Sequence, residues 1–342
     1  MTDELVYIGE DAPGITRHRV GKGFRYVDAA GRRITDAQTL ARIRALAIPP
    51  AYEHVWICAD PRGHIQATGR DARGRKQYRY HEVWKRIRDA DKYQQLEAFG
   101  TALARIRRKV ARDLAGPTMT PERVIATVVR LLELTLIRVG TPRYAVANKS
   151  FGLTTMRRRH ARVAGSTVRF KFRGKSGIEH DVTVRDRRIA RLVKRCMEIP
   201  GQELFQYIDE TGTVRRVESG LVNAYLKEAG GGDFTAKHYR TWAASVYAFS
   251  QLQRRSAAQE RPLNKTVNEV LKETAARLGN TPKVCRDCYV HPAVISTYLE
   301  GKLPQRLAVK SPAGLRADEW RFLQFLRACE LPPDPTVPEQ KV

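Results

Sequence analysis

The spacing of hydrophobic residues changes near residue 81, and this change limits the folds open to the chain. Before it, polar and apolar residues alternate in short runs, as in 23–28 (GFRYVD) and 54–60 (HVWICAD). Such runs, separated by turn signals, predict β-strands. After it, apolar residues recur every three or four positions, which predicts helices. We therefore expect an α+β fold, with a small antiparallel β domain over 1–85 and a larger, mostly α-helical domain over 86–342.

One stretch inside the helical part breaks the helical spacing. In residues 166–185 (STVRFKFRGKSGIEHDVTVR), Val168, Phe170 and Phe172 alternate with basic residues, and a second alternating run follows the sequence GKSG. This pattern predicts a β-hairpin inserted between helices. Lys175 is expected at the tip of its turn.

The helices are predicted from apolar spacing and from their start and stop signals. They are expected at 81–114, 120–140, 186–197, 218–229, 235–255, 266–278 and 282–300. The second of them should begin with Thr120 as N-cap and Pro121 in the first turn, and close at Gly140. His291, which is followed by Pro292, should mark a break in the last one.

The chain is strongly basic, with 62 Lys and Arg against 36 Asp and Glu and a net charge of +26 over 342 residues. This excess predicts a polyanionic partner, most simply nucleic acid. The bases are spread along the chain, which favours a folded basic surface over a disordered arm. There is no apolar run of membrane-spanning length and no signal-peptide pattern, and the five cysteines are an odd number. A cytoplasmic protein with reduced thiols is therefore expected.

The stretch 69–81 (GRDARGRKQYRYH) is the first candidate for contacts with a phosphate backbone, because basic residues alternate there with tyrosines. A solvated loop is the alternative for this stretch. The residues proposed to touch nucleic acid are Arg70, Arg73, Arg75, Lys76 and Tyr78, together with Lys237 further along.

Several common catalytic motifs are absent or incomplete. The GKS at 174–176 lacks the glycine that a phosphate-binding loop needs at position 169, which is Arg169. The HEVWK at 81–85 lacks the second histidine of a zinc protease helix. Cys285 and Cys288 have no second pair nearby for structural zinc, so they are expected to pack within their segment. Because the carboxylates are scattered, no metal or other cofactor is expected.

Metal-free attack on a phosphodiester needs a covalent nucleophile, cations around the phosphoryl oxygens and an acid for the leaving oxygen. A tyrosine, with a pKa near ~10, needs cations beside it to favour the phenolate. The candidates that could supply these groups are Arg138, Lys175, Arg240 and Asn280. Each also has an ordinary structural explanation: a helix C-terminal cation, a solvated turn, a solvated basic stripe shared with Lys237, and a turn amide.

Four segments in this order resemble the type IB DNA topoisomerases, most closely the compact poxvirus-like enzymes of bacteria. They are LIRVGTPRYAVANKSFGLTTMRRRH (136–160), FKFRGKSG (170–177), FTAKHYRTWAAS (234–245) and LGNTPKVCRDCYVHP (278–292). The similarity extends over nearly the whole chain.

The resemblance implies a role for each candidate. Tyr289 is the nucleophile that becomes linked to the 3′ end of the cut strand, and Arg138 and Arg240 stabilise the phosphoryl charge. Lys175 is the general acid for the 5′ oxygen. Asn280 stands where the poxvirus pattern has histidine, so it is expected only to donate a hydrogen bond to a non-bridging oxygen.

The resemblance also implies a monomeric clamp around duplex DNA that relaxes supercoils without ATP or any other nucleotide, in the cytoplasm at the nucleoid. A tyrosine recombinase is the nearest alternative, although such enzymes usually have His-x-x-Arg where this chain has Lys237 before Arg240. A non-enzymatic architectural DNA-binding protein would explain the charge equally well, but not the family order of the site residues.

Overall fold

The computed structural model describes residues 5–72, 74–256, 262–305, 307 and 310–329. They form two compact units, one ending at Lys92 and the other beginning at Tyr93. Helix α2 (Glu82–Ala115) contributes residues to both. The domain boundary that the sequence placed after residue 85 stays a prediction.

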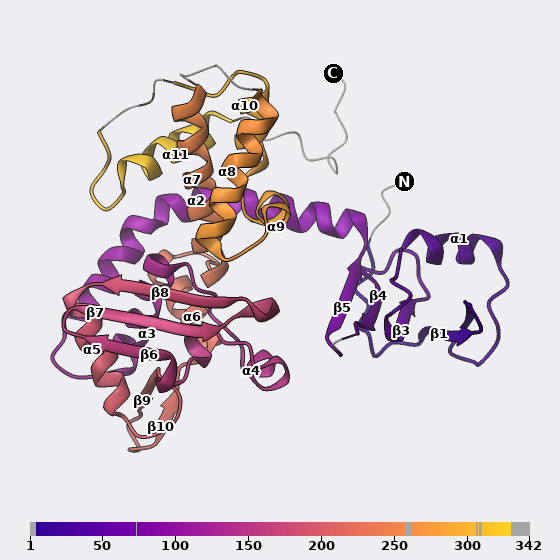
Figure 1. Cartoon of the computed structure of the whole chain (residues 1–342), viewed down its shortest axis with the longest axis horizontal. Helices are drawn as coiled ribbons and strands as arrows, with labels where there is room; N and C mark the ends of the chain where they lie inside the picture. The colour runs from indigo at the N-terminus through magenta and orange to yellow at the C-terminus, as the bar shows by residue number, and fades with distance from the viewer. Residues whose placement is uncertain (1–4, 73, 257–261, 306, 308–309, 330–342) are drawn as a thin grey trace. The chain divides into compact units, whose positions relative to one another are not determined.

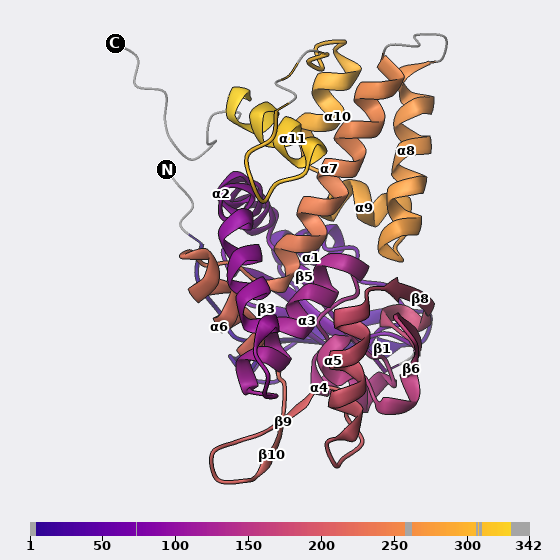
Figure 2. The same ribbon diagram turned by 90° about the vertical axis from the view of Figure 1, so that its left-hand side faces the viewer.

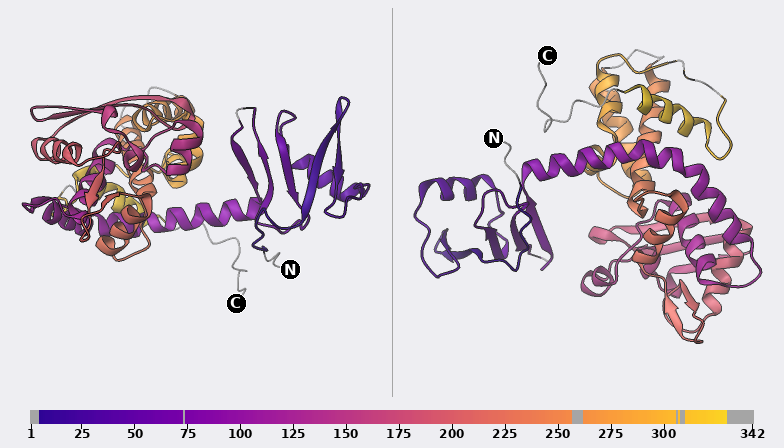
Figure 3. Two further views of the ribbon diagram at one scale, coloured as in Figure 1. Left: turned by 90° about the horizontal axis from the view of Figure 1, so that it is seen from below. Right: turned by 180° about the vertical axis from the view of Figure 1, so that it is seen from behind.

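The first unit is an antiparallel sheet with the strand order β2-β1-β3-β4-β5. Its strands are the indigo to purple arrows of Figure 3. The strands are β1 (Gly14–Val20), β2 (Gly23–Val27), β3 (Glu53–Cys58), β4 (Ile65–Arg70) and β5 (Lys76–Tyr80), and α1 (Ala37–Ala45) precedes β3. A small core of Ile15, Ile43, Val55, Ile57 and Ala67 lies between α1 and the sheet. The predicted strands at 23–28 and 54–60 are therefore confirmed, whereas α1 was not predicted.

The second unit is mainly helical. Its helices after α2 are α3 (Pro121–Thr135), α4 (Pro142–Asn148), α5 (Arg187–Glu198), α6 (Ser219–Gly230), α7 (Ala236–Ser256), α8 (Leu263–Leu278), α9 (Pro282–Cys288), α10 (Pro292–Leu299) and α11 (Ala317–Ala328). Figure 2 shows α7 and α8 running side by side, with α10 and α11 grouped near them. One large apolar core joins these helices, with Trp242 and Phe249 of α7 fully enclosed.

The predicted hairpin is present and gains a third strand (Figure 1). Strands β6 (Ala161–Ala164), β7 (Thr167–Arg173) and β8 (Glu179–Arg185) form an antiparallel sheet in the order β6-β7-β8. Val168, Phe170 and Phe172 are buried, while the alternating basic residues of β7 are exposed. The short turn η3 (Lys175–Gly177) joins β7 to β8, and a separate pair, β9 (Gln206–Ile208) and β10 (Val214–Arg216), follows α5.

The helix expected at 120–140 begins as predicted but ends early. Thr120 caps it by accepting from the Arg123 N–H at 3.3 Å, with Pro121 in the first turn. It ends at Thr135, and Leu136 takes a left-handed conformation with φ 55°. The prediction of a helix up to Gly140 is wrong because the following backbone bonds elsewhere: the Arg138 carbonyl accepts from the Leu153 N–H at 2.9 Å.

The α+β class and the order of its parts are confirmed. Among the described residues, no helix combines the length and the apolar composition that crossing a membrane would require.

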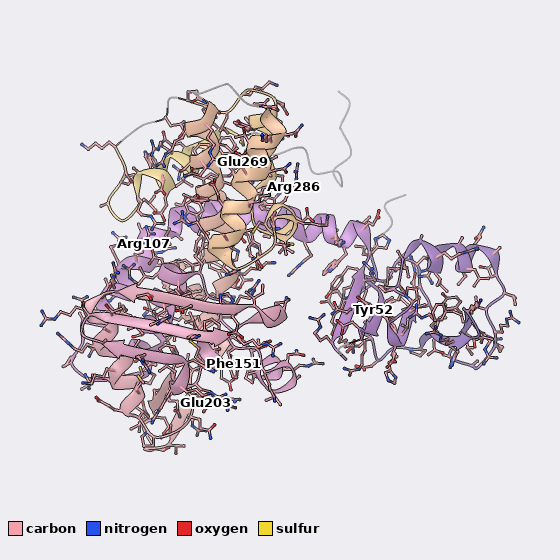
Figure 4. The ribbon with its side chains drawn as sticks, viewed as in Figure 1. Tyr52, Arg107, Phe151, Glu203, Glu269 and Arg286 are labelled. Carbon is pink, nitrogen blue, oxygen red and sulfur yellow. The ribbon has the colours of Figure 1, made fainter. Side chains whose placement is uncertain are left out.

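A buried ion pair joins α2 to α11, a helix that the sequence did not predict. The two terminal nitrogens of Arg107 (labelled in Figure 4) each donate to one oxygen of Glu319 at 2.8 Å. Arg107 Nε also donates to Glu133 at 2.6 Å. The Glu319 side chain is fully buried. Burial alone would raise the pKa of Glu319, but the hydrogen bonds and charge of Arg107, with Arg316, outweigh burial and lower it.

Glu319→Gln should lower the free energy of unfolding by about 3 kcal/mol at pH 7, because it leaves the Arg107 charge only partly compensated. The folded pKa of Glu319 is below its unfolded value of about 4.3, so its contribution is complete above that pH and is lost as the pH falls through the folded pKa. Urea unfolding of the wild type and of Glu319→Gln at pH 7 and near pH 3 should therefore show that the difference in their free energies of unfolding shrinks in acid.

Glu97→Gln is the matched control, because Glu97 pairs with Arg327 of the same helix α11 on an exposed surface. Glu97→Gln should lower the free energy of unfolding by less than about 1 kcal/mol. Equal losses in the two variants would contradict the importance assigned to the buried pair.

Candidate active site

Tyr289 lies at the C-terminal end of α9, where the helix stops. Thr281 caps the start of α9 by accepting from the Val284 N–H at 3.3 Å, and Pro282 occupies its first turn. Tyr289 leaves the helical conformation with φ −130°. Its carbonyl accepts from Ser245 Oγ of α7 at 3.0 Å, which ties this segment to the core. The half-buried ring is thereby held against the core of the second unit.

The break predicted at His291 is confirmed, since His291 is the N-cap of α10. The helix expected over 282–300 is therefore two helices, α9 and α10. Cys285 is fully buried, as expected of a packing residue. Cys288 is exposed, so the prediction that it also packs is wrong. Within the described ranges, no group of three or more His, Cys, Asp or Glu side chains could hold a metal ion.

Arg240 of α7 is buried beside Tyr289, with only 4% of its surface exposed. One terminal nitrogen donates to the carbonyl of Leu136, at the end of α3, and the other to the carbonyl of Leu278, at the end of α8, at 2.9 Å. The guanidinium carbon is 5.1 Å from the centre of the Tyr289 ring. Arg240 therefore caps two helix C-termini, where a cation is favoured, and places its charge at the phenol.

This burial corrects one expectation from the sequence. Lys237, three residues earlier on α7, is exposed, so Lys237 and Arg240 do not form a common solvated stripe. The start of α7 is held by His238, whose Nδ1 accepts from the Thr235 N–H at 2.9 Å.

Arg138 and Asn280 meet although 142 positions separate them in sequence. Arg138 lies in the non-helical segment after α3, and its terminal nitrogen donates to the side-chain oxygen of Asn280. The Asn280 N–H donates to the Ala275 carbonyl at 3.0 Å, which closes the end of α8. Since the oxygen of the amide is already bonded to Arg138, its nitrogen Nδ2 is left as a donor. Nδ2 is buried and has no acceptor among the described residues.

Lys175 is exposed in the turn between β7 and β8. The turn is closed by the Gly174 N–H, which donates to the Ile178 carbonyl at 2.8 Å, and Ser176 takes a left-handed conformation with φ 65°. An exposed ammonium at a hairpin tip is free of the packing that would fix it. The charge of Lys175 nevertheless acts on the Tyr289 phenol.

The charges around Tyr289 change its acidity. Burial alone would raise the pKa of Tyr289, but the charge and hydrogen bond of Arg240, then the charges of Arg138 and Lys175, outweigh it and bring the pKa below its ordinary value. The structure therefore brings the phenol and these three cations together, with Asn280 bonded to one of them. Such a site favours the phenolate and can stabilise an anion next to it.

The stretch 69–81 is a hairpin rather than a loop. It forms the end of β4, a turn, and the edge strand β5. Tyr78 and Tyr80 are both exposed on β5, and their rings stack with centroids 5.9 Å apart. Arg73 lies outside the described residues.

The cations of this hairpin have partners of their own. Arg75 donates to Asp71 at 2.8 Å, and Lys76 forms an ion pair with Glu10. Arg70 is exposed and donates to a carbonyl of the turn. The contacts of these residues and of Lys237 with nucleic acid stay predictions.

The second unit holds a tyrosine on which three cations act, and the family described as "Eukaryotic DNA topoisomerase I, catalytic core" matches residues 81–304. The family described as "Bacterial DNA topoisomerase IB, N-terminal domain" matches residues 23–71. The chain belongs to the type IB DNA topoisomerases.

Curated relatives agree with this family. The chain is 32% identical to DNA topoisomerase 1B of Acanthamoeba polyphaga mimivirus over 293 residues, which cover 83% of this chain and 87% of the relative. It is 23% identical to DNA topoisomerase 1B of vaccinia virus strain Copenhagen over 249 residues, 71% of this chain and 75% of the relative. The resemblance inferred from the four sequence segments is thus confirmed, and the topoisomerase is favoured over a recombinase or an architectural protein.

Proposed function

We propose that this protein relaxes supercoiled duplex DNA by cutting one strand through a 3′-phosphotyrosyl intermediate, letting the cut strand rotate and rejoining it. The observation that carries the proposal is the half-buried phenol of Tyr289 with the Arg240 guanidinium carbon 5.1 Å from its ring, and with the charges of Arg138 and Lys175 acting on the same phenol. These cations come from three separate segments: α7, the segment after α3, and the turn between β7 and β8.

In the cleavage step, the Tyr289 phenol releases its proton to solvent and Oη forms a bond to phosphorus, while the bond between phosphorus and the 5′ oxygen breaks. Lys175 gives a proton to that oxygen, so the second product is a 5′-hydroxyl end. Arg240 and Arg138 stabilise the charge on the phosphoryl oxygens in the transition state. The free Nδ2 donor of Asn280 binds a non-bridging oxygen.

Rejoining reverses these steps. The 5′-hydroxyl attacks the phosphotyrosyl phosphorus and its proton returns to Lys175, while Tyr289 leaves as the phenolate and takes up a proton from solvent. One phosphodiester is exchanged for one phosphotyrosyl ester and then recovered, so neither ATP nor another nucleotide is consumed. The torsional energy of the DNA drives the rotation.

The proposed partner is duplex DNA, held by a monomer in the cytoplasm at the nucleoid. The net charge of +26 supports this, because displacement of phosphate counterions makes binding favourable and steeply dependent on salt. Arg70, Arg75, Lys76, Tyr78 and Lys237 are proposed as contacts with the duplex, together with Arg73.

Relaxation of ordinary supercoiled plasmid in the presence of EDTA and absence of ATP is the expected result for the purified protein, because none of the proposed steps uses a metal or a nucleotide. A time course on an agarose gel measures it. Loss of activity on adding EDTA, restored by Mg²⁺, would contradict the mechanism. Exchange between two defined sites without plasmid relaxation would instead identify a recombinase.

A further inference from the structure

His180 of β8 stands between two parts of the site, and the sequence analysis gave it no role. It pairs in register with Phe172 of β7, and the two rings stack with centroids 4.9 Å apart and planes 8° apart. Its ring also lines a cleft of about 310 Å³ bounded by the end of α3, the start of β8 and the end of α8. The ring therefore lies where the Lys175 hairpin meets the helix that leads to Asn280.

Two glycines lie directly against neighbouring atoms of the His180 ring. A Cβ added to Gly174 would be 2.5 Å from His180 Nε2, and one added to Gly279 would be 2.6 Å from His180 Cε1. Real Cβ atoms do not approach other atoms so closely, so both backbones touch the ring. Gly279 also has φ 60°, whereas Gly174 has φ −95°, which any residue can adopt. At Gly174 it is the His180 ring, and not the backbone conformation, that leaves no room for a side chain.

The next residue after each glycine belongs to the proposed site: Lys175 follows Gly174, and Asn280 follows Gly279. Contact with the same ring thus links the two segments. We propose that His180 is a positioning residue that holds the Lys175 turn at its working distance from Asn280. This inference rests on the proposed roles of Lys175 and Asn280, and it adds a residue that does not itself touch the phosphate.

The ring acts by its shape and not by a charge. Burial, followed by the charges of Arg138 and Arg240, lowers the pKa of His180, and the opposite effect of Glu179 does not compensate. His180 is therefore neutral near pH 7 and adds no further cation to the site. A flat neutral ring of similar size, as in His180→Phe, should keep the spacing, whereas His180→Ala should lose it.

The first test compares single-turnover cleavage of a normal DNA strand with that of a strand whose 5′ leaving atom is sulfur, a leaving group that needs no acid. Lys175→Ala should cleave the oxygen substrate slowly, and its cleavage rate should be largely restored on the sulfur substrate. His180→Ala should slow cleavage of the oxygen substrate by about 100-fold, the scale of a misplaced catalytic group, and be restored on sulfur in the same way. The double variant should be no slower than Lys175→Ala alone.

Val182→Ala is the matched control, because Val182 is the next residue on the same face of β8 and also lines the cleft. Val182→Ala and His180→Phe should each cleave both substrates at rates within a few-fold of the wild-type rate. Equal slowing of His180→Ala on oxygen and sulfur, or additive losses with Lys175→Ala, would overturn the inference. Failure of sulfur to restore Lys175→Ala would instead count against the proposed acid.

The second test does not depend on the identity of the acid. Gly174→Ala should slow cleavage, because its methyl group collides with the His180 ring. Combining it with His180→Ala removes the collision, so the double variant should be no slower than His180→Ala alone. A double variant slower than His180→Ala by the full factor that Gly174→Ala loses on its own would refute the contact on which the inference depends.

Discussion

Tyr289→Phe is expected to bind duplex DNA with unchanged affinity, to form no covalent adduct and to relax no plasmid. The phenylalanine ring can keep the packing against the core and the face toward Arg240, but it has no oxygen with which to attack phosphorus. Removing a covalent nucleophile should lower the rate by at least about 10⁴-fold. Plasmid relaxation, denaturant-trapped protein–DNA adduct and equilibrium binding measure the three effects.

Tyr247→Phe is the matched control within the same unit. Tyr247 also carries an arginine over its ring, Arg277 at 4.3 Å, but its hydroxyl donates to Glu273 at 3.1 Å. This variant should relax plasmid at nearly the wild-type rate. Relaxation by Tyr289→Phe that equals the wild type would refute the proposed nucleophile.

Arg240→Lys should lower the rate of cleavage by about 10²- to 10³-fold, the effect of losing one preorganised donor. The charge is kept, but a lysine cannot donate to the Leu136 and Leu278 carbonyls at once and still face the phenol, because it lacks the planar fork of arginine. Single-turnover cleavage of a labelled strand measures this. Arg277→Lys, which exchanges the arginine over Tyr247, should change the rate by less than about 3-fold. Similar losses in both variants would show that the effect is not specific to the site.

The pH dependence of cleavage should reveal the same charge. Arg240→Gln removes the charge that most lowers the pKa of Tyr289, while the burial that raises this pKa remains. The phenol pKa therefore rises, and the limb of the profile that increases with pH should move to higher pH. An unshifted limb, in a variant that still folds and binds DNA, would mean that Arg240 does not control the acidity of the phenol.

Much of the secondary structure follows from local signals. Thr120 with Pro121 marks a helix start, and His291 with Pro292 marks a break, and the structure confirms both. The end of α3 differs from the prediction because Gly140 is a good stop signal, whereas the carbonyls of Arg138 and Val139 accept from the N–H groups of Leu153 and Thr154. Helix ends that depend on tertiary hydrogen bonds leave no local pattern.

The candidate site was found through the order of four motifs, and spacing alone could not have selected it. Arg240 looked like part of a solvated stripe, and its burial depends on two helix ends that lie 104 and 38 positions away in sequence. His180 was read only as an alternating strand residue, because its contacts with Gly174 and Gly279 join segments about 100 positions apart. A histidine between two glycines becomes visible only when the chain is folded.

The sequence by itself determined the α+β class, the inserted hairpin, the basic character and the type IB topoisomerase family, because periodicity, turn chemistry, net charge and motif order are all properties of the linear chain. Only the tertiary structure decided that Arg240 is buried against Tyr289, that Arg138 bonds to Asn280, and that Cys288 faces solvent while Cys285 does not. The physical reason is that burial, charge proximity and pKa depend on distances through space, and packing of the helices around β6–β8 sets those distances.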